Sequence, residues 1–330
     1  SFGMSTISII TPFKDAAPYL KECIDSICRQ THDSWQLIAI DDHSKDHSKE
    51  IIESYKDPRI EVYTNKGKGI LDALQTAQTY IKGSHVTRMD ADDIMPDKKL
   101  KVLLNVLHIN TLGTVSTGLV KYFSTKPISA GYSSYEAWLN ETSKKGLFYE
   151  RIYRECIVAS PNWLMHRLDF DTIGGFDQLN YPEDYDMVFK WREAGFNIIS
   201  TDSITHHWRE HPKRTSRNSD VYQQESFFRL KTPYFIEEFK NRRIQLIGAK
   251  RKGKLLAEIL KELQCDFDWY EKDVALIGQT LISTEIRDIQ YLKKDEACIL
   301  SIYPEDEFKA NLERFINKRG YYIGVNAHYF

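Results

Sequence analysis

Short apolar segments alternate with helical segments over residues 6–109. Each apolar segment is rich in β-branched residues and is followed by a polar cluster, which is typical of a buried strand that ends in a loop. Apolar residues from Leu20 to Cys28 fall at i, i+3, i+4, i+7 and i+8, the spacing of a helix with one buried face. This alternation predicts a parallel, doubly wound α/β sheet. The expected strands are 6–10, 36–40, 60–63 and 84–89, and the expected helices are 17–30, 47–55, 69–81 and 98–109.

The α/β pattern continues after position 109. Gly248–Gly253 is similar to a dinucleotide-binding fingerprint, but Lys250 stands where the second glycine belongs. We expect an α/β domain over 1–218, a helical connector over 219–242, and a small Rossmann-like α/β domain over 243–330 whose role the sequence does not assign. The further expected strands are 114–120, 197–200, 243–248, 265–270, 298–302 and 321–325, and the further helices are 135–142, one from Glu183, 221–240, one ending near Leu263, and 304–318.

The composition limits the expected binding partners and the expected cellular compartment. Positive and negative side chains nearly balance, with a formal net charge of −2, so no overall field attracts nucleic acid. No segment approaches the roughly 20 apolar residues that span a bilayer. Ser1–Gly3 looks like an addition ahead of a natural Met4, and no signal peptide follows. The five cysteines lack metal-binding spacing and their number is odd, so we expect a protein of the reducing cytoplasm.

Polar clusters follow four of the expected strands. The carboxyl ends of parallel strands share one edge of the sheet, where ligands of such folds bind. In the last cluster Asp90, Asp92 and Asp93 would repel one another without a cation between them. A hard divalent cation that holds a diphosphate fits this cluster, and the alternative is a solvated acidic turn before a helix. The clusters are 11–15, 41–46, 65–69 and 90–93.

Two later segments add candidate chemistry. Glu183 and Asp184 begin a helix, where as simple dipole complements they would contribute well under about 1 kcal/mol each. Further on, three histidines with cationic neighbours favour a metal and phosphate site over a purely structural role. These residues are His206, His207 and His211, with Arg209, Lys213 and Arg214 beside them.

Five segments, in order, resemble the motifs of family 2 glycosyltransferases. Thr6–Asp15 resembles the opening strand of these enzymes, with Asp15 where the family usually has asparagine. Asp41–Asp46 resembles their Asp-Asp-Gly-Ser-x-Asp loop, with His43 in place of glycine. The resemblance extends from residue 5 to about 217 and does not cover 243–330. The other three are Asp90–Asp93, similar to the DXD motif, Glu183–Asp184, similar to the Glu-Asp motif, and Arg209–His211, similar to the Arg-x-His segment.

The resemblance implies a GT-A fold, in which a doubly wound mixed sheet binds a nucleotide sugar. It further implies an inverting, metal-dependent sugar transfer, with a UDP-sugar as the expected donor and Mn²⁺ or Mg²⁺ as the cofactor. The acceptor would be a hydroxyl of a glycan, a lipid-linked sugar or a polysaccharide. This role is compatible with peripheral association at the inner face of the cell membrane and with a homodimer.

The resemblance also implies roles for individual residues. Asp42 would accept a hydrogen bond from the uracil imide, with Pro12 and Asp15 shaping the same pocket. Asp184 would be the catalytic base, and we expect the neighbouring carboxylates Glu183 and Asp186 to raise its pKa. The remaining contacts are expected from Lys66 and Lys68 over the nucleotide, Asp90 at the ribose, Asp92 at the metal, Asp93 in support of metal or sugar, His211 at the metal or pyrophosphate, Arg209 beside His211, and Glu183 beside the base.

Two other functions compete with this interpretation. A sugar nucleotidyltransferase also places carboxylates and a metal at strand ends, but it holds a triphosphate in a glycine-rich loop after its first strand. Here the segment 11–15 has no glycine and contains Pro12, which lacks an N–H. A nucleotide-sensing module without turnover would use the unit at 243–330 and has no need for Glu183 and Asp184. The sequence therefore favours the glycosyltransferase.

Overall fold

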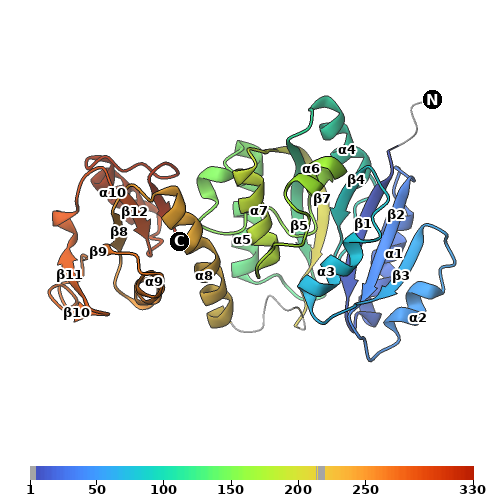
Figure 1. The fold of residues 1–330 in the computed structure, drawn as a ribbon, viewed down its shortest axis with the longest axis horizontal. Helices are drawn as coiled ribbons and strands as arrows, with labels where there is room; N and C mark the ends of the chain where they lie inside the picture. Colours follow the sequence, from blue (N-terminus) through green and yellow to red (C-terminus); the bar gives the residue numbers. More distant parts are fainter. Residues whose placement is uncertain (1–4, 213, 215–219) are drawn as a thin grey trace. The chain divides into compact units, whose positions relative to one another are not determined.

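A seven-stranded sheet organises the first part of the chain (Figure 1). β1 pairs in parallel with β2 and β4, whereas β6 is antiparallel to both β4 and β5. The mixed sheet implied by the family resemblance is confirmed. The four strands for which strand–helix alternation predicted parallel pairing are parallel. The antiparallel strand β6, a short strand that comes after α5, was not among the expected strands. In spatial order the strands are β3 (Ile60–Thr64), β2 (Trp35–Asp41), β1 (Ile7–Phe13), β4 (His85–Arg88), β6 (Leu164–His166), β5 (Thr114–Phe123) and β7 (Asn197–Arg209).

The computed structural model describes residues 5–212, 214 and 220–330. Ser1–Met4, Lys213 and the expected boundary between 218 and 219 lie outside the described residues. The chain divides into two structural units, the first comprising 1–148 and 157–217 and the second 149–156 and 218–330. The segment 149–156, expected within the first domain, is thus grouped with the second unit.

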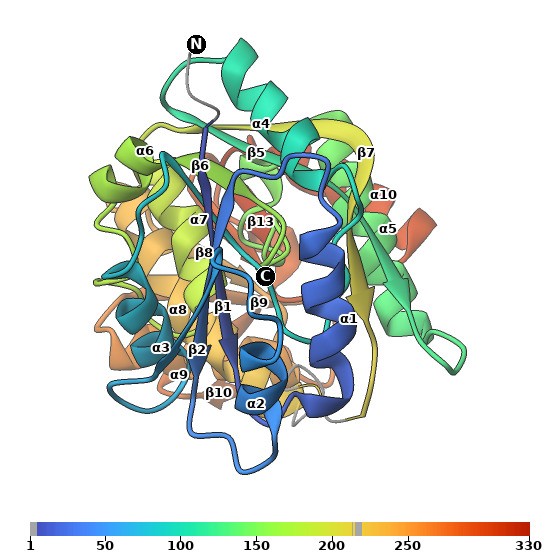
Figure 2. The ribbon, with the colours of Figure 1, turned by 90° about the vertical axis from the view of Figure 1, so that its right-hand side faces the viewer.

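Helices cover both faces of the first sheet. Figure 2 shows α1 and α2 on one side of β1 and β2, with α3 on the other. Ile7 and Ile9 of β1 pack against Leu20 and Ile24 of α1, and all four side chains are buried. Burying such a side chain contributes about 1.5–3 kcal/mol, so this face holds β1 in register with its neighbours. The helices of this unit are α1 (Ala17–Cys28), α2 (Ser48–Glu53), α3 (Ile70–Gln78), α4 (Lys99–Ile109), α5 (Ala130–Lys145), α6 (Arg167–Thr172) and α7 (Glu183–Glu193).

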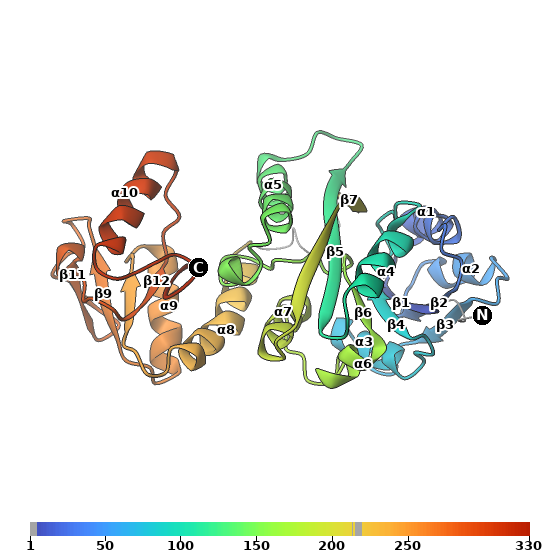
Figure 3. The same ribbon diagram turned by 90° about the horizontal axis from the view of Figure 1, so that it is seen from above.

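The edge strand β7 carries the histidine-rich segment. It runs beside β5 along its length (Figure 3), with register shifts between Thr117 and Val120. A Cβ at Gly118 would lie 2.4 Å from Thr205 Oγ1, so glycine permits the close approach of the two strands. The strand expected at 197–200 therefore continues to Arg209, because an edge strand tolerates the exposed polar residues 202 and 203.

The second unit contains a six-stranded sheet in which four consecutive pairings are parallel. Gly324, at φ +84°, lies in a turn closed by the Val325 N–H and the Tyr322 carbonyl. The strand expected at 321–325 is therefore wrong, and the last strand follows this turn. In spatial order the strands are β10 (Thr280–Leu281), β11 (Thr284–Asp288), β9 (Phe267–Glu271), β8 (Ile244–Ile247), β12 (Ala297–Leu300) and β13 (Ala327–Tyr329), and the helices are α8 (Asp220–Glu238), α9 (Arg251–Glu262) and α10 (Asp306–Asn317).

Candidate active site

The carboxyl ends of β1, β2 and β4 meet at one edge of the first sheet. Phe13 pairs with Asp41, and Ile10 pairs with Arg88, so the loops that follow these strands start side by side. The Asp42 N–H donates to the Phe13 carbonyl at 2.8 Å, which continues the pairing into the loops. Parallel pairing therefore brings together the polar clusters that follow β1, β2 and β4.

Asp42 supports the loop that follows β3. Its Oδ1 accepts from Asn65 Nδ2 at 2.9 Å and from the Gly69 N–H at 3.1 Å. Gly69 has φ +89°, and a Cβ at Gly67 would lie 2.2 Å from Asp72 Oδ2. Both glycines are therefore required by the shape of this loop. The nucleobase role of Asp42 stays a prediction, and the geometry adds that Asp42 also holds the 65–69 loop.

His43 replaces the glycine of the family motif in the backbone conformation that glycine favours. It has φ +59°, and its Nε2 lies 2.8 Å from the Gly67 carbonyl oxygen. That contact links the loop after β2 to the loop after β3. A histidine at this position is thus accommodated by a hydrogen bond that glycine could not make, which offsets part of the left-handed strain.

Asp15 holds the loop after β2 from the opposite side. Its Oδ1 accepts from the Lys45 N–H at 2.7 Å and the Asp46 N–H at 3.2 Å, and its own N–H donates to Ser44 Oγ at 3.0 Å. Pro12 is half-buried within β1. Together these contacts shape one wall beside Asp42, where the donor pocket is expected.

Lys66 and Lys68 are exposed on the 65–69 loop. The Lys66 ammonium lies 5.7 Å from the centre of the Tyr80 ring, and the Lys68 N–H donates to Asp72 Oδ2 at 2.8 Å. The backbone of this loop is therefore fixed, while both side chains reach solvent. Their expected contact with a nucleotide stays a prediction.

Three carboxylates gather directly after β4. Oxygens of Asp90, Asp92 and Asp93 lie within 4.8 Å of one another, a spacing that a metal ion could bridge. The Asp90 and Asp92 side chains are 18% and 20% exposed, whereas the Asp93 side chain is fully buried. The cluster is therefore divided into two carboxylates open to a ligand and one that faces the protein interior.

Asp93 anchors the end of β7. Its Oδ2 accepts from His206 Nε2 at 2.8 Å, and its Oδ1 accepts from the Arg209 N–H at 2.9 Å. Burial alone would raise its pKa, but Arg214 and the His206 hydrogen bond outweigh burial and hold the pKa well below its usual range. For Asp92, burial and the adjacent carboxylates raise the pKa against the opposing effect of Arg214. Asp92 is thus the carboxylate whose charge most needs a further cation.

Arg214 contacts all three carboxylates. Its guanidinium lies 3.1 Å from Asp90 Oδ2, 3.2 Å from Asp92 Oδ1 and 2.7 Å from Asp93 Oδ1. Sequence analysis placed Arg214 beside the histidines but gave it no role. The excess of cations after β7 was the available signal, since three adjacent carboxylates require a counter-charge.

The three histidines do not form one metal site. His206 is fully buried and lies 3.1 Å from Lys99 Nζ, and burial lowers its pKa to about 4, so the ring is neutral. His207 pairs with Ile94 through its backbone. Only His211 reaches the open carboxylates, with Nε2 2.6 Å from Asp92 Oδ2. The structure does not support one metal and phosphate site formed by all three. Both ring nitrogens of His206 already contact Asp93 and Lys99, and His207 occupies the alternate strand position, which faces the opposite side.

Arg209 and His211 flank Tyr19 at the rim of the carboxylate cluster. Arg209 Nε donates to the Asp92 carbonyl at 2.8 Å, and its guanidinium lies 4.8 Å from the centre of the Tyr19 ring. The His211 ring lies 4.6 Å from the Tyr19 ring, and its buried Nδ1 has no hydrogen-bond partner among the described residues. This nitrogen is available to a ligand in two ways. In its neutral form it can bind a cation, and in its protonated form it can donate a hydrogen bond to a phosphate oxygen.

Arg88 joins the carboxylate cluster to the start of α7. Its Nε lies 3.6 Å from Asp90 Oδ1, and its NH1 donates to Glu183 Oε1 at 3.1 Å. Sequence analysis gave Arg88 no role, although a charged residue in a buried strand needs a buried partner. This contact places Glu183 and Asp184 at the same edge of the sheet as Asp90.

Asp184 stands beside the Arg88–Glu183 pair. The Tyr185 N–H donates to its Oδ1 at 2.9 Å. Burial, and then the neighbouring Glu183 carboxylate, raise the pKa of Asp184 to about 7, against the opposing effect of Arg88. The raised pKa agrees with the expected direction, although Asp186 does not contribute as expected. Asp186 is buried, and its Oδ2 accepts from the Asn180 N–H at 2.7 Å.

The fold and the site together indicate an α/β enzyme. A carboxylate cluster, a carboxylate-capped loop and a carboxylate of raised pKa all lie at the carboxyl edge of a mixed α/β sheet, where ligands of such sheets bind and where a shifted pKa is typical of a functional site. The profile of Glycosyl transferase family 2 matches residues 8–174, so the chain belongs to this family and is a glycosyltransferase. This assignment excludes the nucleotidyltransferase and sensing-module alternatives as the function of the first unit.

Individual relatives and solved structures agree with the family. An uncharacterized glycosyltransferase of Haemophilus influenzae is 24% identical over 290 residues, which cover 80% of this chain and 87% of that protein. A UDP-Glc:alpha-D-GlcNAc-diphosphoundecaprenol beta-1,3-glucosyltransferase, WfgD of Escherichia coli, is 28% identical over 169 residues, covering 49% of this chain and 60% of that protein.

Two solved structures share the fold. The S. aureus TarS fragment 1-349 in complex with UDP-GlcNAc has a TM-score of 0.53 at 16% identity, and the match covers 77% of this chain and 71% of that chain. Mannosyltransferase PcManGT from Pyrobaculum calidifontis, in complex with GDP-Man and Mn²⁺, has a TM-score of 0.52 at 18% identity, covering 79% and 71%. The GT-A fold expected from the sequence is confirmed. Within the described residues, no helix has the length and apolar character needed to cross a membrane.

Proposed function

We propose that this enzyme transfers a sugar from a nucleotide-sugar donor, a UDP-sugar first among them, to a hydroxyl of a glycan, lipid-linked or polysaccharide acceptor, with inversion at the anomeric carbon. The observation that carries the proposal is the Arg88 bridge, which places Asp184 beside the carboxylate cluster. The relatives support a nucleotide-sugar donor, because TarS is seen with UDP-GlcNAc and PcManGT with GDP-Man. WfgD, named for a UDP-Glc donor and a diphosphate-linked lipid acceptor, supports this acceptor class.

The residues present fit a divalent cation. Asp90 and Asp92 offer partly exposed carboxylate oxygens, and hard ions such as Mg²⁺ and Mn²⁺ prefer oxygen ligands. Asp92 would ligate the ion, with Asp90 toward the ribose and the unpartnered His211 Nδ1 toward the ion or pyrophosphate. Asp93 would support the site without binding the ion, because its oxygens already accept hydrogen bonds from His206 and Arg209. A bound cation would supply positive charge for the leaving diphosphate.

In the proposed reaction, the acceptor oxygen attacks the anomeric carbon on the face opposite the diphosphate. The bond between that carbon and the β-phosphate oxygen breaks, and the nucleoside diphosphate leaves with its electron pair. Asp184 takes the acceptor proton, for which a carboxylate with a pKa of about 7 is suited near neutral pH. Glu183 raises the pKa of Asp184 through its negative charge, while Arg88 holds Glu183 in place. Arg209 and Arg214, which contact the carboxylate cluster, would meet charge that develops on the diphosphate.

A donor screen tests the proposal. The purified chain is incubated with UDP- and GDP-sugars and Mn²⁺, and release of nucleoside diphosphate is measured with and without candidate acceptors. We expect release from at least one UDP-sugar, and we expect NMR of the product to show the inverted anomeric configuration. Retention of configuration would contradict single displacement by an Asp184-activated hydroxyl.

Replacing Asp42 with alanine should weaken nucleoside-diphosphate binding by about 1–3 kcal/mol, the cost of a lost buried polar partner. The expected cause is loss of the carboxylate that accepts a hydrogen bond from uracil, and binding is measured by calorimetry with UDP. Asn65→Ala serves as the comparison, because Asn65 donates to Asp42 and to the Gly69 carbonyl and no contact with uracil is expected from it. Equal weakening in both variants would show that Asp42 acts only by supporting the loop.

Replacing Arg214 with glutamine should lower the melting temperature in the presence of a chelator, because three carboxylates lose their shared counter-charge. Mn²⁺ should then raise the melting temperature of Arg214→Gln more than that of the unaltered protein. Arg229→Gln is the matched control, since Arg229 pairs with Glu225 and Glu262 on an exposed surface. An identical Mn²⁺ response in Arg214→Gln and the unaltered protein would argue against a metal at these carboxylates.

A further inference from the structure

The second unit has a topological switch point of its own. β8 lies between β9 and β12 and is parallel to both. The chain adds β9 and β11 on one side of β8 and then β12 and β13 on the other side, so the direction in which the sheet grows reverses between β8 and β12. Ligands of doubly wound sheets bind beyond the carboxyl ends of the strands at such a point. Gly248 follows β8 with φ +107°, and a Cβ at Gly253 would lie 2.0 Å from the Gly248 oxygen. This strand-to-helix turn is therefore as tight as in nucleotide-binding folds.

The turn itself does not present its backbone to a pyrophosphate. Glu271 Oε2 accepts from the Ala249 N–H at 2.8 Å, and Glu271 Oε1 accepts from the Lys272 N–H at 2.9 Å. A carboxylate therefore occupies the place where a dinucleotide would bring phosphate oxygens. With Lys250 in place of the second glycine, these contacts argue against a dinucleotide at the turn.

A cavity of about 180 Å³ lies within the second unit near this edge of the sheet. Lys252 enters it from the first turn of α9, and Phe330, which follows β13, lines it. Arg154 also lines it, and the Arg154 guanidinium lies 4.2 Å from the centre of the Tyr303 ring, just past β12. One water needs only about 10–15 Å³ of such space, so a tetrahedral anion with a small attached group can be held.

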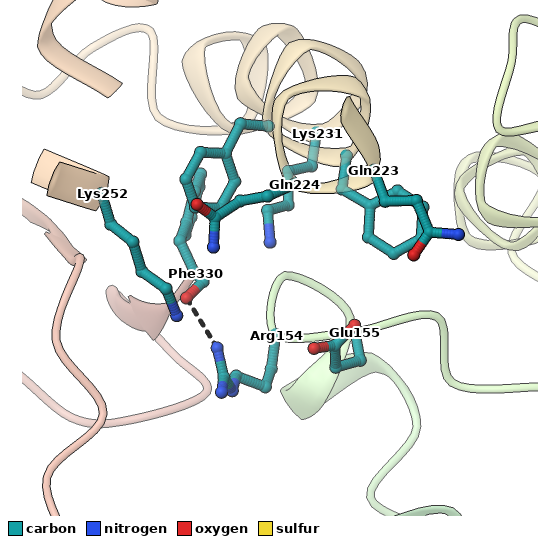
Figure 4. A pocket seen from close by; sticks show the side chains of 9 residues that line it. Arg154, Glu155, Gln223, Gln224, Lys231, Lys252 and Phe330 are labelled. Atoms are coloured by element: carbon teal, nitrogen blue, oxygen red, sulfur yellow. Dashed lines mark hydrogen bonds between the residues drawn. The ribbon is translucent and has the colours of Figure 1, made fainter. Parts of the chain in front are cut away.

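The side chains in this cavity, named here the cationic pocket, are mainly donors. Figure 4 shows Arg154, Lys231 and Lys252 directed toward the same space, with Gln224 between the lysines. Lys231 is 1% exposed, and its Nζ donates to the Tyr153 carbonyl at 2.7 Å. Arg154 NH1 donates to the Phe330 main-chain oxygen at 2.8 Å. Glu155 is the one acidic side chain among the residues that line the pocket.

We propose that the cationic pocket binds a phosphate group, carried by a small phosphate monoester or present as free phosphate. Three basic side chains and one acidic side chain give the lining an excess of basic groups in a partly closed space, which an oxyanion would complement. The first turn of α9 adds the positive end of a helix dipole. The inference does not depend on the proposed sugar transfer, because no residue of the pocket belongs to the first unit.

The protonation of the two lysines supports this site. Burial lowers the pKa of Lys231 to about 7, against attraction by Glu155, and Arg154 lowers it further. Burial and the Arg154 charge also lower the pKa of Lys252. A bound anion would favour the protonated form of both lysines and would gain charge-assisted hydrogen bonds from them.

Calorimetry on the full chain tests the proposal, with inorganic phosphate and glycerol 3-phosphate titrated separately in the presence of a chelator. We expect millimolar or tighter binding of at least one, and a dissociation constant about tenfold weaker for Lys252→Ala, the usual effect of one charge-assisted hydrogen bond. Lys254→Ala is the control, because Lys254 is an exposed lysine on the same helix that does not line the pocket. Tighter binding of glycerol 3-phosphate than of phosphate would identify the monoester as the ligand class.

Three results would overturn the proposal. The first is absence of binding by both anions at millimolar concentration. The second is equal affinity of Lys252→Ala and Lys254→Ala for the anion that binds, and the third comes from Lys231. Lys231→Met adds a second variant, checked for folding by circular dichroism, and a folded Lys231→Met that binds phosphate normally would also contradict the site. If Lys231→Met does not fold, the comparison of Lys252→Ala with Lys254→Ala decides the matter.

Discussion

Replacing Asp184 with asparagine should lower turnover by about 10² to 10⁴, while donor binding stays nearly unchanged. A positioned general base is worth a factor of this order, and asparagine keeps the size and the hydrogen bond from the Tyr185 N–H but cannot take a proton. Donor affinity is expected to survive because the base faces the acceptor hydroxyl. Turnover at saturating donor and calorimetry with the nucleoside diphosphate, on the same protein, separate the two effects.

A carboxylate at a helix start could instead serve only the helix dipole. Glu307→Gln is the control for that role, because Glu307 lies in the first turn of α10 and is exposed. Loss of a dipole-facing charge costs at most about 1 kcal/mol of stability and little rate. Near-normal turnover in a folded Asp184→Asn protein would reject Asp184 as the base and leave Glu183 as the carboxylate to test.

The pH dependence gives a second measurement on Asp184→Asn. The base must be ionised, so turnover of the unaltered enzyme should fall as pH drops below about 7, the raised pKa of Asp184. Stability should change with pH in the opposite direction to turnover. Between pH 3.8, the ordinary pKa of an aspartate, and about pH 7, the folded protein keeps the Asp184 proton that the unfolded chain has lost. Asp184 therefore destabilises the fold increasingly as the pH rises through this range. Asp184→Asn should therefore melt at a higher temperature than the unaltered protein at pH 8, and the difference should shrink toward pH 4.

Replacing Asp92 with alanine should abolish nucleoside-diphosphate release to the level of the uncatalysed background. Asp92 is partly exposed, has a pKa raised by burial and by the adjacent carboxylates, and lies with Asp90 and Asp93 at metal-bridging distance. A chelator should have the same effect on the unaltered enzyme, and Mn²⁺ or Mg²⁺ should restore its activity. Removing the cation removes a stabilising charge worth several kcal/mol in the transition state.

The control for Asp92→Ala is a carboxylate outside the cluster. Asp97 follows on the same loop, its side chain is 64% exposed, and its ion pair with Arg29 is long at 3.6 Å. Asp97→Ala should keep full activity and full metal response. Asp93→Ala is unsuitable, because loss of a buried acceptor for His206 and Arg214 would threaten folding itself. Activity that persists in a chelator would remove the metal from the proposed mechanism.

The local pattern of the chain was sufficient to predict where the donor pocket should lie. Asp42 and Asp90 each follow a buried apolar strand, and parallel strands end at a shared edge. That inference needs only the alternation of strands and helices and the chemistry of carboxylates. The direction of β6 could not be predicted in this way, because Leu164–His166 is too short for its neighbouring strands to be identified from its own sequence.

The sequence by itself determined the alternation of strands and helices, the order of the motifs and the placement of carboxylates at strand ends, because periodicity and turn chemistry act over a few neighbouring residues. Only the tertiary structure decided which carboxylate is open and which is buried. Asp92 and Asp93 are adjacent and chemically identical, yet one faces solvent and the other His206 on β7. The Arg88–Glu183 pair and the three contacts of Arg214 likewise join residues far apart along the chain. Such pairings depend on how strands and loops pack, and no local pattern encodes the partner of a buried charge.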